Sequence, residues 1–318
     1  MAERKILIWL ILLTLCIAIM PFGSALAADE GMINPEADAS LTIAYRCEDL
    51  AFPGLQLELY KIASVSADFS FTLEKSFLGH GLEINGVEST AEWNTVRTTL
   101  EALIVSKNIG PTATAATNEE GEVSFGDLKP GLYFVTAASG EQDGTKCSFD
   151  CALVSLPSYG GDGALEYHVA VAAKPTMISL GDIEYKVIKL WKDENDPGYR
   201  PKSIEVEIYK NRKLHETVVL SEKNNWTYTW TAPNDGSRWL TTEKKVDESY
   251  ILSVERREAS FVLTNTLGSN RPDNPPKPPP PTGDSSNIML YSILMYASGA
   301  VLIVLGITGR RKRHEKTG

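Results

Sequence analysis

The sequence is poor in the residues that carry most enzyme and metal chemistry. Its 318 residues include only four histidines and four cysteines, and these are scattered along the chain. The sequence has no nucleophile–histidine–acid arrangement, no cluster of metal ligands and no glycine-rich phosphate loop. We therefore expect no metal and no cofactor, and a surface enzyme is the least favoured of the functions weighed below.

Positive charge is also scarce, with 31 basic against 41 acidic residues and a net charge of −10. The first 27 and the last 36 residues hold seven of the basic and three of the acidic ones, so the segment between them carries −14. Such a segment repels phosphate and has few cations with which to release the counterions of a nucleic acid. Nucleic acid is therefore excluded as a partner.

The N-terminus has the three parts of a secretory signal peptide. Arg4 and Lys5 form a short basic start, and the run 6–20 is almost wholly apolar. Small residues follow at 25–27 (Ala-Leu-Ala), where a signal peptidase needs room. We predict a signal peptide at 1–27, cleaved after Ala27; an uncleaved anchor helix is the alternative.

A second long apolar run, 288–307, lies near the C-terminus. It holds twenty residues without a charge, about 30 Å as a helix, which matches the hydrocarbon core of a bilayer. The tail that follows, 308–318, opens with a basic cluster that would hold this end in the cytoplasm. We predict a transmembrane helix at 288–307, with the residues before it on the extracellular side of the membrane.

The segment just before this run, 268–284, is rich in proline and is predicted to be a semi-rigid spacer. It ends in Pro280-x-Thr282-Gly283. Pro-x-Thr-Gly, an apolar span and a basic tail resemble the signal that sortases read in Gram-positive surface proteins. The resemblance implies a sortase as partner, cleavage after Thr282 and linkage to peptidoglycan or another pilus subunit. Pro279 stands where that pattern has Leu, and a plain membrane-anchored protein is the alternative.

Short alternating strands and one helix are predicted for a first domain at 29–176. Residues 55–62 alternate, with Leu55, Leu57, Leu59 and Lys61 on one face. Ser89 and Glu92 form a capping box, and the apolar residues that follow recur at helical spacing to about residue 106, which predicts one buried helix face. Residues 121–125 and 132–136 are predicted to form a hairpin-like pair around the turn at 129–131.

The cysteines outside the signal peptide are an odd set of three in an oxidising compartment. Cys147 and Cys151 fall within one predicted strand, 146–156, and would share a face about 13 Å apart, beyond disulfide reach. Cys47 could pair with either of them and leave the other free. Three buried free thiols are the alternative.

The first domain resembles the N-terminal modules of Gram-positive pilins and surface proteins. Leu59-Tyr60-Lys61, the turn at 117–121 and the stretch 125–133 (FGDLKPGLY) carry the resemblance. Pilins place the lysine that accepts the next subunit where Lys174 closes this domain, although the usual Tyr-Pro before it is absent. The alternative for Lys174 is a plain linker lysine.

A second β domain is predicted at 183–267. Five stretches in order and spacing resemble the B-type repeat of collagen adhesin, the Cna-B domain: 189–194 (KLWKDE), 200–204 (RPKSI), 206–209 (VEIY), 225–228 (NWTY) and 261–266 (FVLTNT). The chain is therefore predicted to be mainly β, with two β-sandwich domains of prealbumin-like, Ig-like architecture, the first with one inserted helix.

The Cna-B resemblance implies an isopeptide bond inside the second domain, between Lys189 and Asn265, with Glu243 as its catalytic acid. Burial disfavours charge, which leaves an amine neutral and a carboxyl group protonated. A neutral amine can then add to the Asn carbonyl while the acid polarises it and moves protons. The alternatives are that Lys189 is an exposed strand lysine, that Asn265 is a turn residue and that Glu243 is a surface carboxylate.

These features together predict a surface protein anchored to the envelope of a Gram-positive bacterium. It would act as a structural stalk, either as a pilus subunit or as a stand-alone adhesin. The alternative function is a membrane-anchored module that binds a host matrix protein.

Overall fold

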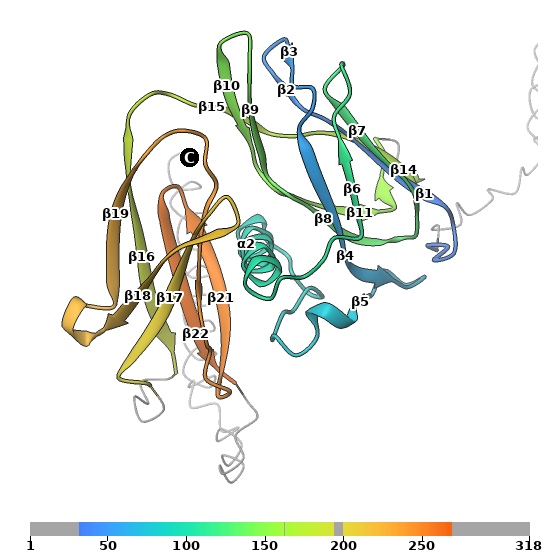
Figure 1. Ribbon diagram of the computed structural model, residues 1–318. Coiled ribbons are helices and arrows are strands. Elements are labelled where there is room, and N and C mark those ends of the chain that lie inside the picture. The colour runs from blue at the N-terminus through green and yellow to red at the C-terminus, as the bar shows by residue number, and fades with distance from the viewer. Residues whose placement is uncertain (1–31, 162, 194–199, 269–318) are drawn as a thin grey trace, which may run out of the picture. The chain divides into compact units, whose positions relative to one another are not determined.

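The computed structural model describes residues 32–161, 163–193 and 200–268 (Figure 1). The chain divides into two compact units, 1–269 and 270–318, and all described residues belong to the first. The predicted signal peptide, the sorting motif and the apolar run at 288–307 lie outside the described residues. None of the helices within 32–268 that are described has the length and apolar character needed to cross a bilayer.

Residues 32–177, called the first domain below, are built mainly of short strands. These are β1 (Ala39–Ala44), β2 (Arg46–Cys47), β3 (Leu50–Ala51), β4 (Gln56–Val65), β5 (Phe71–Leu73), β6 (Ala113–Ala116), β7 (Glu122–Leu128), β8 (Gly131–Val135), β9 (Ala138–Gln142), β10 (Thr145–Phe149), β11 (Ala152–Leu156), β12 (Ser158–Tyr159), β13 (Leu165–Glu166), β14 (His168–Ala172) and β15 (Pro175–Met177). The larger sheets have the orders β14-β1-β7, β15-β10-β9 and β11-β8-β4-β5, with β6 also paired to β4.

Strand β4 is buried on both faces, which the alternation at 55–62 did not predict. Leu57 and Leu59 belong to one apolar cluster, and Tyr60 and Ile62 belong to another. The register against β8 shifts between Lys61 and Ala63, so the strict alternation ends there. The sheet that contains β4 therefore separates two cores.

The predicted helix is α2, Thr90–Ser106, the one α-helix among the described residues. Its capping box is formed: the Ser89 hydroxyl accepts from the Glu92 amide, and the Glu92 carboxylate accepts from the Ser89 amide at 2.9 Å. The prediction of a single buried face was wrong, because residues 98–102 are all buried. A helix turns 100° per residue, so five consecutive positions cannot share one face.

The hairpin predicted around residues 129–131 is not formed. Strand β7 pairs with β1, whereas β8 pairs with β4 and β11, so the two strands belong to different sheets. Asp127, near the end of β7, has a positive φ of 54°, and Pro130, between the two strands, has no amide hydrogen to donate. The turn therefore carries the chain from one sheet to the other.

The single strand predicted at 146–156 is two strands, β10 and β11, in different sheets. Cys147 and Cys151 are both buried, but they belong to different apolar clusters and do not share a face. Cys147 forms a disulfide with Cys47, and Cys151 is a buried free thiol.

Residues 182–267, called the second domain, form two sheets whose apolar inner faces build one cluster (Figure 1). The strands are β16 (Asp182–Lys192), β17 (Ser203–Lys210), β18 (Lys213–Ser221), β19 (Thr227–Pro233), β20 (Trp239–Glu243), β21 (Tyr250–Arg257) and β22 (Ser260–Leu267). One sheet has the order β19-β16-β22-β21 and the other β18-β17-β20. The domain boundaries taken from the sequence stay predictions.

Candidate crosslinking site

Lys189, Asn265 and Glu243 lie together inside the second domain. Lys189 is on β16 and Asn265 on β22, which are parallel neighbours in the four-stranded sheet, with Trp191 opposite Asn265. Lys189 continues the alternating buried positions of β16, whereas Asn265 ends a run of five buried positions, 261–265, on β22. Glu243 ends β20 in the other sheet, opposite the buried Val206. The three polar groups therefore meet between the two sheets, at one end of the apolar core.

One carboxylate oxygen of Glu243 contacts both other residues. The Lys189 ammonium donates to Oε2 at 2.8 Å, and the Asn265 Nδ2 donates to the same oxygen at 3.0 Å. The side chains of Lys189 and Glu243 are 0% and 1% exposed. A fully buried ion pair with an amide at the same oxygen is a costly arrangement for stability alone, so it calls for a chemical explanation.

The surroundings of Lys189 disfavour its charge. Burial lowers the pKa of Lys189 from its usual value to about 8, although the neighbouring Glu243 carboxylate opposes the shift. The indole of Trp191 lies beside the amine, with Nζ 4.7 Å from the ring centroid. An amine with this pKa is partly neutral near physiological pH, which is the condition for nucleophilic attack on an amide.

The carbonyl oxygen of Asn265 is buried and has no hydrogen-bond partner among the described residues. Glu243 contacts the nitrogen of this amide rather than its oxygen. The expected polarisation of the carbonyl by Glu243 is therefore not formed in this arrangement. The arrangement instead links the attacking nitrogen of Lys189 and the departing nitrogen of Asn265 through one oxygen, which suits a proton shuttle.

Aromatic side chains close the site on the side of Trp191. This indole packs edge-on against Trp226 and Tyr250, with ring centroids 5.3 Å and 5.1 Å away. Nearby, the buried carboxylate of Asp193 accepts from Arg200 Nη2 at 2.6 Å and from the Tyr250 hydroxyl at 3.4 Å. The resemblance includes the stretches that contain Asp193 and Arg200, but it did not predict their pairing; the available signal was an Asp and an Arg seven positions apart.

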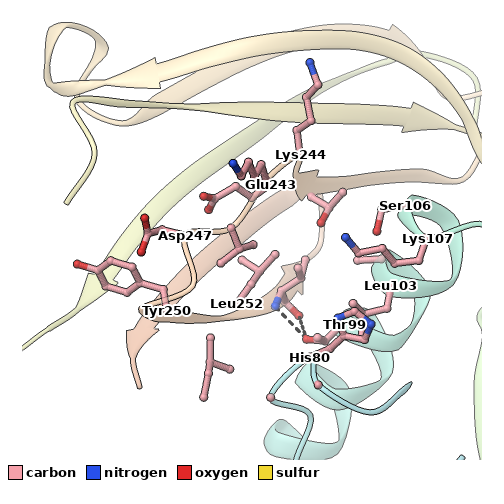
Figure 2. A pocket seen from close by; sticks show the side chains of 18 of the residues that line it. His80, Thr99, Leu103, Ser106, Lys107, Glu243, Lys244, Asp247, Tyr250 and Leu252 are labelled. Carbon is pink, nitrogen blue, oxygen red and sulfur yellow. Dashed lines mark hydrogen bonds between the residues drawn. The ribbon is translucent and has the colours of Figure 1, made fainter. Parts of the chain in front are cut away.

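A cavity of about 470 Å³ adjoins the crosslinking site. Its wall includes Glu243 and Tyr250 from the second domain and Thr99 and Lys107 from the first (Figure 2). Glu243 therefore borders this cavity, although its side chain is buried between the two sheets.

The other sequence candidates lie apart from this site. Lys174 is exposed in the connection between β14 and β15. Cys47 and Cys147 join β2 to β10 in the first domain. Within the described ranges, no group of three or more His, Cys, Asp or Glu side chains could hold a metal ion. Pro280, Thr282 and Gly283 lie outside the described residues.

The segment that carries the crosslinking site matches a known family. Residues 185–266 match the family model described as Cna protein B-type domain. The collagen adhesin of Staphylococcus aureus is 32% identical over 122 residues, which cover 34% of this chain and 10% of that protein. The match thus spans about a tenth of the length of the relative.

Solved structures of surface proteins resemble the chain at low identity. A single B repeat unit of the collagen-binding surface protein of Staphylococcus aureus covers 73% of this chain and 99% of its own, with 17% identity and a TM-score of 0.25. The T6 backbone pilin of Streptococcus pyogenes covers 55% of this chain and 40% of its own, with 16% identity and a TM-score of 0.32. The major pilin SpaD of Corynebacterium diphtheriae covers 74% and 66%, with 15% identity and a TM-score of 0.29.

Proposed function

We propose that this chain is a structural protein of the bacterial surface, of the adhesin or pilin type, whose second domain closes itself with a covalent bond between Lys189 and Asn265. The observation that carries the proposal is the buried contact of both residues with one oxygen of Glu243. This contact lies within the segment that matches the Cna protein B-type domain. A load-bearing stalk is the function that such a bond serves best.

The reaction exchanges one amide for another. Neutral Nζ of Lys189 attacks Cγ of Asn265, and the new C–N bond replaces the bond between Cγ and Nδ2. Glu243 takes a proton from the attacking nitrogen and passes it to Nδ2, which leaves as ammonia. No oxidant or co-reactant is needed, and the loss of ammonia would make the step irreversible.

Mass spectrometry of the protein isolated from cell envelopes tests the proposal. After reduction of the disulfide, we expect an intact mass about 17 Da lower than that of the processed sequence, the loss of one ammonia. Proteolysis should release a branched peptide that joins segments of β16 and β22. An unchanged mass, with separate peptides from the two strands, would contradict the crosslink.

The rate of bond formation should rise with pH as the amine of Lys189 loses its proton. Because the pKa of Lys189 is lowered to about 8, the neutral fraction of the amine rises about tenfold per pH unit below that value and levels off above it. The rate should follow the neutral amine, because only this form can attack the Asn265 amide. The measurement is the time course of ammonia loss in freshly translated chains transferred to buffers of different pH.

A different profile would contradict attack by the neutral amine of Lys189. If the rate of ammonia loss does not rise with pH below about 8, the neutral fraction of this amine does not limit the reaction.

Attachment to the envelope is part of the same proposal and rests on the sequence. A sortase would cleave after Thr282 and join the chain to peptidoglycan or to another subunit. Lys174, which is exposed, is where the next subunit would be attached if the protein polymerises. The envelope sample used for the mass measurement should show a C-terminus at Thr282 and would reveal any branch at Lys174.

Binding to a host matrix protein is the second candidate function. The relative at 32% identity is named a collagen adhesin, but the match spans about a tenth of its length. We therefore place the structural role first and leave a ligand unassigned.

A further inference from the structure

Helix α2 of the first domain contributes to the cores of both domains. Val96, Leu100 and Ile104 belong to an apolar cluster of the first domain. Ala102, 2% exposed, belongs to the apolar cluster of the second domain, and Val105 packs against that cluster. The helix is therefore a shared wall of two cores, which explains why its buried positions do not form one stripe.

The same helix completes the hydrogen bonding of a strand edge. β21 is the last strand of its sheet and pairs with β22 on one side. On its other side, the amide of Val254 donates to the Thr99 hydroxyl at 2.9 Å, and that hydroxyl donates to the Val254 carbonyl at 3.3 Å (Figure 2). An unpaired edge exposes such groups and invites pairing with other chains. Here a threonine side chain satisfies both.

A buried ion pair fixes the orientation of this contact. Arg238 of the second domain donates two parallel bonds to Glu101 of α2, at 2.9 Å from Nε to Oε1 and 2.7 Å from Nη2 to Oε2. Its Nη1 donates to Asp150 at 2.9 Å. The side chains of Arg238 and Glu101 are 18% and 9% exposed. A bidentate, desolvated pair specifies geometry far better than an exposed one.

The free thiol of the first domain lies against the same ion pair. Cys151 Sγ is 3.5 Å from Arg238 Nη2 and 3.8 Å from Glu101 Oε2. Cys151 is 2% exposed, so the ion pair and the helix help to cover it. Its chemical accessibility therefore reports whether the two domains are in contact at this point.

We propose that Thr99 and Glu101 of α2, with Val254 and Arg238 of the second domain, form a lock that makes the two domains open as one cooperative unit. The lock covers the open edge β21, which is hydrogen-bonded to the strand that carries Asn265. In a protein that transmits force, such a lock keeps the edge of the crosslinked domain from pairing with other chains. It also prevents the two domains from hinging independently.

The test removes the ion pair of the lock and measures hydrogen exchange at the Thr99–Val254 contact. Glu101→Gln and Arg238→Gln, alone and together, are made in the full chain, and hydrogen exchange is followed in peptides that contain Val254. If the lock opens as a unit, exchange at Val254 should accelerate roughly tenfold or more in each variant. The double variant should be no faster than the faster single one, because both changes remove the same pair.

A matched control breaks an ion pair that lies outside the lock. Arg257 and Glu255 form an exposed pair on β21 itself, and Arg257→Gln should leave exchange at Val254 unchanged. The reaction of Cys151 with a thiol reagent, located by peptide mass spectrometry, should accelerate in the Glu101 and Arg238 variants and stay at the wild-type rate in Arg257→Gln.

Gly81→Ala perturbs the lock without touching the ion pair. Gly81 has a φ of +67°, and a Cβ there would lie 2.4 Å from Cγ2 of Ile251 on β21. This variant should also accelerate exchange at Val254, and it serves where an ion-pair variant does not fold. Unchanged exchange at Val254 in folded Glu101→Gln, Arg238→Gln and Gly81→Ala chains would overturn the lock, because the contacts would then be independent of one another.

Discussion

Lys189→Ala should lower the free energy of unfolding by about 4–5 kcal/mol and abolish the loss of ammonia. The bond to Asn265 would close a loop of 76 positions, nearly the whole second domain, and cross-linking a loop of this length removes about that much chain entropy from the unfolded state. The measurement is denaturant unfolding of wild type and variant, with intact mass recorded for each sample. Lys192→Ala, an exposed lysine at the end of the same strand, is the control and should change neither quantity.

Glu243→Ala tests whether Lys189 and Asn265 can form the bond without the carboxylate. It keeps Lys189 and Asn265 but removes the oxygen that contacts both nitrogens. We expect an uncrosslinked chain that is at least as unstable as Lys189→Ala, because the buried amine also loses its partner. A Glu243→Ala chain that still loses ammonia would contradict the shuttle, and a Lys189→Ala chain as stable as wild type would contradict the closed loop.

The meeting of Lys189, Asn265 and Glu243 could be predicted because the Cna-B resemblance named all three residues. Strand alternation agrees with the buried positions of Lys189 with Val187 and of Asn265 with Leu263, but it would not have singled these residues out. The position of Glu243 depends in addition on how the two sheets pack. The bond between Lys189 and Asn265 stays a prediction. The unpaired oxygen of Asn265 could not be predicted, because it depends on how one amide is turned within the core.

The second role of α2 left little trace in the sequence. Three of the residues that it presents to the second domain, Thr99, Glu101 and Ala102, are small or polar and are typical of a solvent-facing helix surface. Hydrophobic periodicity detects the core against which a helix packs its apolar residues. It does not detect a second domain that the helix contacts through an ion pair and a hydroxyl group. Strand periodicity likewise predicts one strand at 146–156, although Cys147 and Cys151 are buried in different cores.

The disulfide between Cys47 and Cys147 should stabilise the first domain about as strongly as the proposed isopeptide bond would stabilise the second. It closes a loop of 100 positions, for which the loss of chain entropy in the unfolded state corresponds to about 4.7 kcal/mol. Both residues lie in an aromatic part of the core, where Phe149 contacts Tyr45 and Phe52 with ring centroids 5.2 Å and 5.3 Å away. Cys47→Ser should therefore lower the free energy of unfolding by several kcal/mol.

The two closures differ in what can undo them, and this difference makes the disulfide prediction specific. A reductant should reproduce the effect of Cys47→Ser in wild-type protein, because it opens a disulfide but leaves an amide intact. Cys151→Ser is the control: it removes the thiol that forms no disulfide and should leave the sensitivity to reductant unchanged. A wild-type unfolding curve that is the same with and without reductant would show that the disulfide contributes no stability. If the free energy of unfolding falls in both Lys189→Ala and Cys47→Ser, each domain depends on its own covalent bond. Reduction would then open only the bond of the first domain.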